Sequence, residues 1–472
     1  MPVHTSSHSE YRQRIRQWTR IRDCLNGEDA IKSKTYQYLP RLRNQSQHDY
    51  NVMLERGLFT SFTARILDGL AGMITRKDPE LEYVEDLSHY FEDSDDTGLS
   101  FWELREELAR ELLSQGRLFV FVDWKIEGSD PYILTAKAEQ CINWKITDNK
   151  LEWLVIEEAV EAPKDTKDIF DTEVKNQYRL LIIRNGVYTV EIYNHKGELV
   201  YTPMTPTNEG STLDSIPGFF VDPAGINGAV IKPPFSDVTS INIAHFRNSC
   251  DYESAIHLTA SPFLCIIGST SDSEITVGPS KALVLPDPNS NAKWVDFNGE
   301  GLTSLENAMK DKITQLALFS SRISDQSTRG SESSTSVALR HGAESATLST
   351  TARSIETALN LIYGYIAKFK GVEAPSIELS RDFTSSKLTP AEQKALLETY
   401  LAGAIDKEAY LDAIFKGELI TFQAKERMEA DPLDVGELAV KNAMIEPSGT
   451  MGRPQIEDNV DKLNNETGMM SE

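Results

Sequence analysis

Two long helical segments that flank a short β-rich insert constrain the fold more than any other feature. Residues 236–259, which follow Pro233-Pro234, are predicted to form one helix of about six turns. Residues 260–302 hold short apolar runs separated by turn signals, which predict a few short strands. Residues 303–323 are predicted to form a second helix, because their apolar side chains recur three and four residues apart. Two paired helices share a single apolar seam, so we expect them to need neighbours, and a ring of identical copies supplies these.

The chain after the second helix alternates polar and helical segments. Residues 324–337 are polar and of low complexity, which predicts a loop. A third long helix is predicted over residues 338–369, followed by a strand over 376–383. Thr389-Pro390 then begins a helix with a capping box, and Asp406 begins the last helix.

Helices also begin the chain. A helix that starts at residue 10 carries several arginines, and residues 10–43 hold nine Lys or Arg against four Asp or Glu. These arginines form either a solvated helix face or a face that docks on something acidic, such as nucleic acid or a neighbouring acidic subunit. Further helices are predicted over residues 50–74 and 99–116, the latter with a capping box at Ser100.

Two segments between and after these helices differ from them in composition. Residues 78–96 carry nine Asp or Glu and no Lys or Arg, and they are predicted to form a loop. Residues 117–222 consist of short β-branched and aromatic runs, and Asn185-Gly186 predicts a hairpin with a type I′ turn. The pattern as a whole indicates an α+β protein with a mostly antiparallel β region.

Charge and composition exclude several classes of protein. The 472 residues include 48 Lys and Arg and 72 Asp and Glu, which gives a net charge of −24. This charge argues against a protein that grips DNA over its whole surface, but not against one that lets DNA pass. No apolar run approaches the roughly 20 residues of a membrane span, and the N-terminus lacks the apolar region of a signal peptide. The four cysteines lie far apart, so neither a disulfide framework nor a zinc site is expected.

Motifs for catalysis and cofactor binding are missing from the sequence. It contains no phosphate-binding P-loop, no dinucleotide fingerprint, no HExxH and no GxSxG. We therefore expect no enzyme activity, no metal and no cofactor, and no dependence of folding or assembly on metal or nucleotide.

The order of these elements, and several local sequences, resemble the portal proteins of tailed bacteriophages. The resemblance covers roughly residues 35–430. The segments that carry it are Tyr38-Leu39-Pro40-Arg41-Leu42, Asp68-Gly69-Leu70-Ala71-Gly72, Asn242-Ile243-Ala244-His245-Phe246-Arg247, Trp294-Val295-Asp296-Phe297, Asp382-Phe383 and Thr389-Pro390-Ala391-Glu392.

The resemblance implies a portal fold with named parts. These parts are a wing (1–236 and 338–387), a two-helix stem (237–259 and 303–323), a small β-rich clip (260–302), a tunnel loop (324–337), a helical crown (388–435) and an acidic, partly disordered tail (436–472).

It also implies roles for particular residues. The tunnel-loop residues expected to face DNA are Ser327, Thr328, Arg329, Glu332 and Ser333. The residues expected to pack the stem are Ile241, His245, Tyr252, Leu305, Met309, Leu316 and Phe319, and those of the clip are Phe263, Trp294 and Phe297. The tunnel loop is expected to project into the channel, where Arg329 and Glu332 offset each other and allow contact with DNA without tight binding.

The partners and location follow from the same resemblance. A portal is a dodecameric ring at one capsid vertex of the virion, made in the cytoplasm of the host bacterium. Double-stranded DNA passes through it, and terminase and then adaptor or tail proteins dock on its clip. The major capsid protein surrounds it, and a scaffold protein is a further partner.

Two other interpretations stay open at this stage. The chain could be another virion assembly protein, such as a head–tail adaptor or minor capsid protein, although adaptors are usually much shorter. It could also be a cytosolic enzyme whose site has no local signature.

Overall fold

The computed structural model divides the chain into two units, Met1–Phe383 and Thr384–Glu472. It describes residues 6–124, 130–148, 150–165, 168–208, 210–259, 263–267, 291–295, 300–319, 334–381, 383 and 390–416. Within the described residues, helices and antiparallel strands are mixed, which confirms the predicted α+β class.

The helices of the first unit are α1 Ser9–Asn26, α2 Glu28–Ser33, η2 Thr35–Gln37, α3 Gln47–Arg56, α4 Phe62–Thr75, η3 Glu85–Leu87, α5 Ser88–Glu92, α6 Phe101–Ser114, α7 Ser236–Thr259, α8 Glu300–Phe319 and α9 Ser334–Lys370. Its strands are β1 Glu80–Glu82, β2 Leu118–Trp124, β3 Pro131–Lys137, β4 Cys141–Thr147, β5 Lys150–Asp165, β6 Asp168–Arg184, β7 Val187–Tyr193, β8 Thr207–Asn208, β9 Ser211–Thr212, β10 Gly218–Asp222, β11 Gly225–Ile226, β12 Phe263–Ile267, β13 Asn291–Val295 and β14 Ser376–Glu378.

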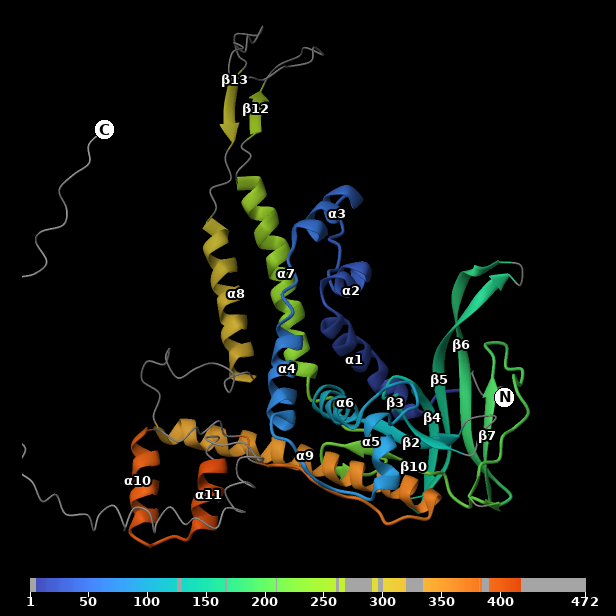
Figure 1. Cartoon of the computed structure of the whole chain (residues 1–472). Coiled ribbons are helices and arrows are strands. Elements are labelled where there is room, and N and C mark those ends of the chain that lie inside the picture. The colour runs from blue at the N-terminus through green and yellow to red at the C-terminus, as the bar shows by residue number, and fades with distance from the viewer. Residues whose placement is uncertain are drawn as a thin grey trace, which may run out of the picture. The chain divides into compact units, whose positions relative to one another are not determined.

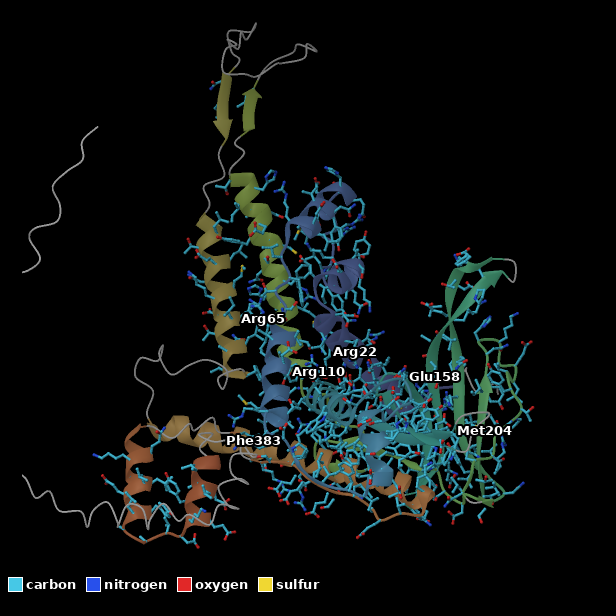
Figure 2. All side chains as sticks on the ribbon, in the orientation of Figure 1. Arg22, Arg65, Arg110, Glu158, Met204 and Phe383 are labelled. Atoms are coloured by element: carbon cyan, nitrogen blue, oxygen red, sulfur yellow. The ribbon has the colours of Figure 1, made fainter. Side chains whose placement is uncertain are left out.

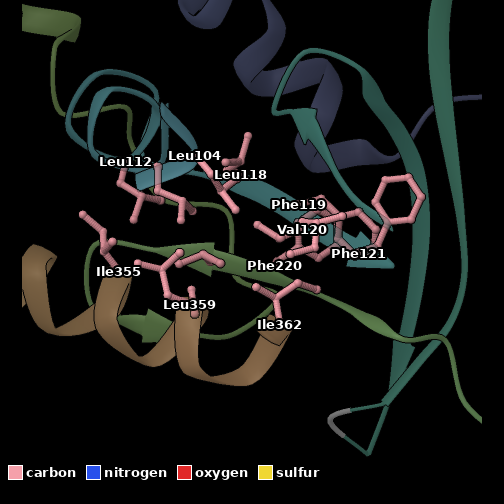
Figure 3. Packing of buried hydrophobic residues seen from close by; sticks show 14 of the residues in the cluster. Leu104, Leu112, Leu118, Phe119, Val120, Phe121, Phe220, Ile355, Leu359 and Ile362 are labelled. Atoms are coloured by element: carbon pink, nitrogen blue, oxygen red, sulfur yellow. The ribbon is translucent and has the colours of Figure 1, made fainter. Parts of the chain in front are cut away.

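The main core lies around a four-stranded sheet with the order β11-β10-β2-β3. Every residue of β2 is buried, and the side chains of α6, β2, β10 and α9 converge in one cluster (Figure 3). The predicted apolar stripe of the third long helix faces this core. Its members Leu348, Ala352, Ile355, Leu359, Ile362 and Ile366 are at most 2% exposed. Burial of each large side chain here contributes about 1.5–3 kcal/mol, so α9 is held firmly against the sheet.

A second four-stranded sheet has the order β4-β5-β6-β7. The β6–β7 turn confirms the predicted type I′ hairpin, since Asn185 and Gly186 have φ angles of 52° and 80°. Pairing with β4 ends at Ile156, and pairing with β7 ends at Tyr178. Beyond these points β5 and β6 continue as a two-stranded ribbon (Figure 1).

The prediction of a single helix over residues 50–74 is wrong. The structure has two helices, α3 and α4, separated by residues 57–61. The backbone at Gly57 passes so close to α7 that a Cβ there would lie 2.2 Å from Cys250 Sγ. The amide of Leu58 donates to Ser249 Oγ at 3.0 Å. A tertiary contact therefore ends α3, and the local apolar periodicity does not show it.

Three further boundaries differ from the predictions. The acidic segment 78–96 is not a loop throughout, because it contains β1, η3 and α5, and β1 pairs with β14 far along the chain. Helix α9 begins at Ser334, inside the predicted tunnel loop. Strand β14 covers only Ser376–Glu378 of the strand predicted over 376–383.

The second unit contains α10 Pro390–Leu401 and α11 Lys407–Lys416. Gly403 follows α10 with a φ angle of 73°, and Asp406 Oδ1 accepts a hydrogen bond from the amide of Ala409 at 2.8 Å. The Tyr400 and Tyr410 rings stack at 4.6 Å. The two helix starts predicted from sequence are therefore confirmed.

The four cysteines are free thiols. None of the helices that the structure describes combines the length and apolarity needed to cross a bilayer.

Candidate assembly surface

Helices α7 and α8 form a projecting arm of the first unit, which we call the helical arm. They pack side by side, and the β12–β13 pair lies between them in sequence (Figure 1). Strands β12 and β13 are antiparallel, with Phe263 opposite Val295 and Leu264 opposite Trp294. The arm therefore consists of two helices and a strand pair that joins their far ends.

The foot of the arm is held by a buried asparagine. Asn242 of α7 is fully buried, and its Oδ1 accepts hydrogen bonds from the amide of Thr63 at 3.0 Å and from Thr63 Oγ1 at 2.9 Å. Its Nδ2 donates to the carbonyl oxygen of Thr60 at 2.9 Å. These bonds satisfy the first turn of α4, whose free amides need acceptors, and so fix α7 to the body.

Contacts higher on α7 continue the attachment. Arg247 Nε donates to the carbonyl oxygen of Tyr38 at 2.6 Å. The buried Phe246 ring meets Phe59 edge-on, with ring centroids 5.9 Å apart. Together with the close approach of Gly57 to Cys250, these contacts hold α7 against the segment between α2 and α4.

His245 belongs to this packing. It is 4% exposed and lies edge-on to Phe62 at 5.2 Å. Burial lowers its pKa from the ordinary value, and the positive charge of Lys312 on α8 lowers it further. A neutral imidazole between α4 and α8 serves as a packing group.

The outer half of the arm is much less covered than its foot. From Asp251 to Thr259, no described side chain of α7 is buried. On α8, Leu316 is 2% exposed, whereas Leu305 and Met309 are half-buried. Ile313 and Phe319, at the two edges of the same apolar stripe, are 42% and 43% exposed. The stripe of α8 is therefore wider than α7 alone can cover.

The structure places the predicted stem residues as follows. His245 and Leu316 are buried within the chain, and Ile241, Tyr252, Leu305 and Met309 are half-buried. Phe319 was expected to face protein, but its side chain is 43% exposed, so the described residues of its own chain do not cover it fully. Helix α8 is described to Phe319, so residues 320–323 of the predicted helix lie outside the described residues.

The remaining predicted site residues belong to the clip and the tunnel loop. Phe263 and Trp294 lie on β12 and β13, and their role in a clip stays a prediction. Phe297 lies outside the described residues, as do Ser327, Thr328, Arg329, Glu332 and Ser333. The described residues contain no group of three or more His, Cys, Asp or Glu side chains arranged to hold a metal ion.

Sequence reasoning missed the anchoring role of Asn242 and Ser249. Both are buried polar residues on α7 that hydrogen-bond across to the segment between α3 and α4. A polar side chain on the buried face of an amphipathic helix is the one signal that could have revealed them, since buried polar groups need partners.

Comparisons with known proteins match the helical arm and the wider chain in different ways. Residues 234–370, which run from just before α7 to the end of α9, match the model of a family described as a domain of unknown function, DUF4055. That match spans 137 of the 472 residues. No curated protein matches the chain.

Among solved structures, the chain is similar to proteins of gene transfer agent particles. A chain in the virion of a native gene transfer agent particle is 10% identical, with a TM-score of 0.38, and the match covers 81% of this chain and 98% of that one. A chain in the neck of an empty particle, computed with C6 symmetry, is 10% identical with a TM-score of 0.39 and coverage of 75% and 90%. A chain in the neck of a native particle, computed with C12 symmetry, is 11% identical with a TM-score of 0.37 and coverage of 79% and 94%.

Proposed function

We propose that this chain is a structural protein of a phage-like virion and that it is the portal: a closed ring of identical copies around a DNA channel. The observation that carries the proposal is the helical arm. Two antiparallel helices leave the body with a strand pair at their far end, and the apolar stripe of α8 extends beyond the surface that α7 covers. The quoted portal-like sequence segments support the same interpretation, because Asn242–Arg247 form the anchored foot of this arm.

Burial of the exposed edges of the α8 stripe favours association with a neighbouring copy. Ile313 and Phe319 are large apolar side chains that remain more than 40% exposed along one stripe. Burial of such a side chain from full exposure contributes about 1.5–3 kcal/mol, so covering the remaining two-fifths contributes about 0.6–1.3 kcal/mol each. In a ring, the next copy's arm meets this stripe in every subunit, so the gain recurs around the whole assembly.

The role in the virion follows from the portal interpretation. Double-stranded DNA passes through the channel during packaging and ejection. The strand pair β12–β13 belongs to the clip that receives terminase and then adaptor or tail proteins, and the segment 324–333, before α9, faces the DNA. The acidic character of the chain, at −24 per copy, keeps the channel from binding phosphates tightly. In this role the protein performs no chemical reaction, holds no cofactor, and sits at a capsid vertex beside the major capsid protein.

A measurement of native mass tests the proposal. Mass spectrometry of the intact assembly, combined with sedimentation over a wide range of concentration, should give a discrete ring of about a dozen copies. A matched control is the Ile313→Ser/Phe319→Ser variant, which should fold with the same circular dichroism and lose the ring. A wild-type chain that stays a monomer or dimer at every concentration would refute the portal proposal.

A further inference from the structure

A hollow of about 540 Å³ lies between α1, the segment after η2, and α7. Its walls include three arginines, Arg16, Arg20 and Arg247, with Tyr38 and Ile243 beside them. We call this hollow the arginine pocket. Three cations that line one hollow are unexpected in a chain with a net charge of −24.

The arginines of α1 divide into those with partners in their own chain and those without. Arg22, which is labelled in Figure 2, points inward: its Nη1 donates to Glu111 at 2.8 Å and its Nε donates to Glu139 at 2.6 Å. Arg16 and Arg20 form no ion pair with any described residue, and Arg20 Nε is buried without a hydrogen-bond partner there. The interpretation of the whole N-terminal helix as a solvated basic face is therefore wrong for Arg22, whereas Arg16 and Arg20 are left for a ligand.

The remaining wall of the pocket adds no negative charge that is available. Tyr38 donates its hydroxyl to Asp23, and Asp23 is already bound by Lys34 Nζ at 2.7 Å. Arg247 uses Nε on the Tyr38 carbonyl oxygen, which leaves its two terminal nitrogens as donors. Guanidinium groups match carboxylates in a bidentate geometry, so the pocket is built to receive acidic side chains.

The same unit carries a surface of opposite charge. Residues 78–96 hold nine Asp or Glu and no Lys or Arg. Seven of the nine are exposed, and we call these the acidic face: Asp78, Glu80, Glu82, Glu85, Asp86, Glu92 and Asp96. The pairing of β1 with β14, and the buried Leu87 and Phe91 beneath, hold these carboxylates on ordered backbone.

The β5–β6 ribbon is the other acidic surface, and three of its acids already form ion pairs within the chain. Asp171 binds Lys164, Glu173 binds Lys175, and Glu158 binds Arg179. A DNA duplex is a weaker candidate too, because it would have to approach a chain with a net charge of −24. The charge pattern thus favours the acidic face as the occupant.

We propose that the arginine pocket binds carboxylates of the acidic face of a second copy of this chain. This inference rests on the proposed ring. The two surfaces differ, so the contact is head-to-tail, and a head-to-tail contact that closes on itself generates a ring. Opposite charges on the two surfaces steer the encounter and set its register, which makes ring assembly sensitive to salt.

A charge exchange on the full-length chain tests the proposal. One variant reverses the charge of the pocket (Arg16→Glu/Arg20→Glu). Another reverses the net charge of the face with four changes (Glu80→Lys/Glu82→Lys/Glu85→Lys/Asp86→Lys). Each variant alone should fail to form the ring, and the affinity between its copies should be at least about tenfold lower than in the wild type. An equimolar mixture of the two should recover a ring in which they alternate, because each then meets an opposite charge.

Matched controls separate this contact from a general effect of charge. Arg12→Glu/Arg14→Glu makes the same two changes on the same helix outside the pocket. Glu157→Lys/Glu161→Lys/Asp171→Lys/Glu173→Lys makes four matching changes on the ribbon. Both controls should assemble like the wild type. Circular dichroism of every variant establishes that it is folded, and fluorescence anisotropy with labelled duplex DNA checks whether the pocket variant changes phosphate binding.

The outcomes are distinct. Recovery of rings only in the mixture supports the proposal. If the pocket variant assembles normally, the proposed contact is overturned, although the proposed ring is not. The same conclusion follows if the ribbon control fails to assemble while the face variant assembles normally. A pocket variant that assembles normally but loses DNA binding assigns the arginines to phosphate and also overturns it. A wild-type chain that never forms a ring refutes the proposed function itself.

Discussion

Replacement of Asn242 by alanine should detach the foot of the helical arm. The change removes three hydrogen bonds, two accepted from Thr63 and one donated to the Thr60 carbonyl. Each is worth about 1 kcal/mol net, and the groups left behind are buried, so the free energy of unfolding should fall by about 3 kcal/mol. Urea unfolding followed by tryptophan fluorescence, at concentrations where the chain is monomeric, measures this change.

Two controls sharpen the measurement. Ser240→Ala, on the same helix, removes a hydroxyl that only bonds back to the Ser236 carbonyl, and should change stability by less than about 0.5 kcal/mol. Thr63→Val removes only one of the two bonds to Asn242 Oδ1, and its effect should not add to that of Asn242→Ala, because the two side chains share the bond. If Asn242→Ala proves as mild as Ser240→Ala, the buried network does not anchor α7 and the reasoning fails.

Three other perturbations have definite outcomes. Phe319→Ser should change the free energy of unfolding of the monomer by no more than about 0.5 kcal/mol, since the Phe319 residue is 43% exposed. It should lower the mass of the native assembly, and an unchanged mass would contradict the role of Phe319 in contacts between copies. Gly57→Ala should cost about 1–3 kcal/mol in the same urea assay, because the new Cβ meets Cys250 Sγ, and an unchanged midpoint would show that the segment moves freely. Burial raises the pKa of the Cys24, Cys141 and Cys250 thiols to about 12, so the folded chain keeps protons that the unfolded chain loses; stability should therefore fall as pH rises from about 9 towards 12, and a flat profile would contradict the burial.

Local signals in the sequence predicted the elements whose ends are set by neighbouring residues. The Asn185-Gly186 turn, the capping box of Ser100 and Glu103, and the start of α7 after Pro233-Pro234 all appear in the structure. In each case the backbone geometry depends on residues within a few positions, so the sequence carries the information.

Features that depend on distant contacts could not be predicted in this way. The break between α3 and α4 is caused by Cys250 and Ser249, almost two hundred residues away. The pairing of Leu81 in β1 with Ile377 in β14 has a still longer separation. The inward turn of Arg22 towards Glu111 has the same cause, since a periodic pattern shows a helix face but not what lies opposite.

The candidate assembly surface also combines features that local sequence predicts with features that depend on distant contacts. The helices of the arm and their apolar stripe could be predicted, because helical spacing alone specifies them. Its anchoring asparagine and the arginine pocket could not, since each requires elements that the sequence separates by almost two hundred residues or more.

Electron cryomicroscopy of the purified full-length protein shows directly whether copies close into a ring through their arms. We predict a closed ring with a central channel, in which the arm of each copy lies against the next and covers Ile313 and Phe319 of α8. A map of single copies, or of a ring in which this stripe remains open to solvent, would contradict it.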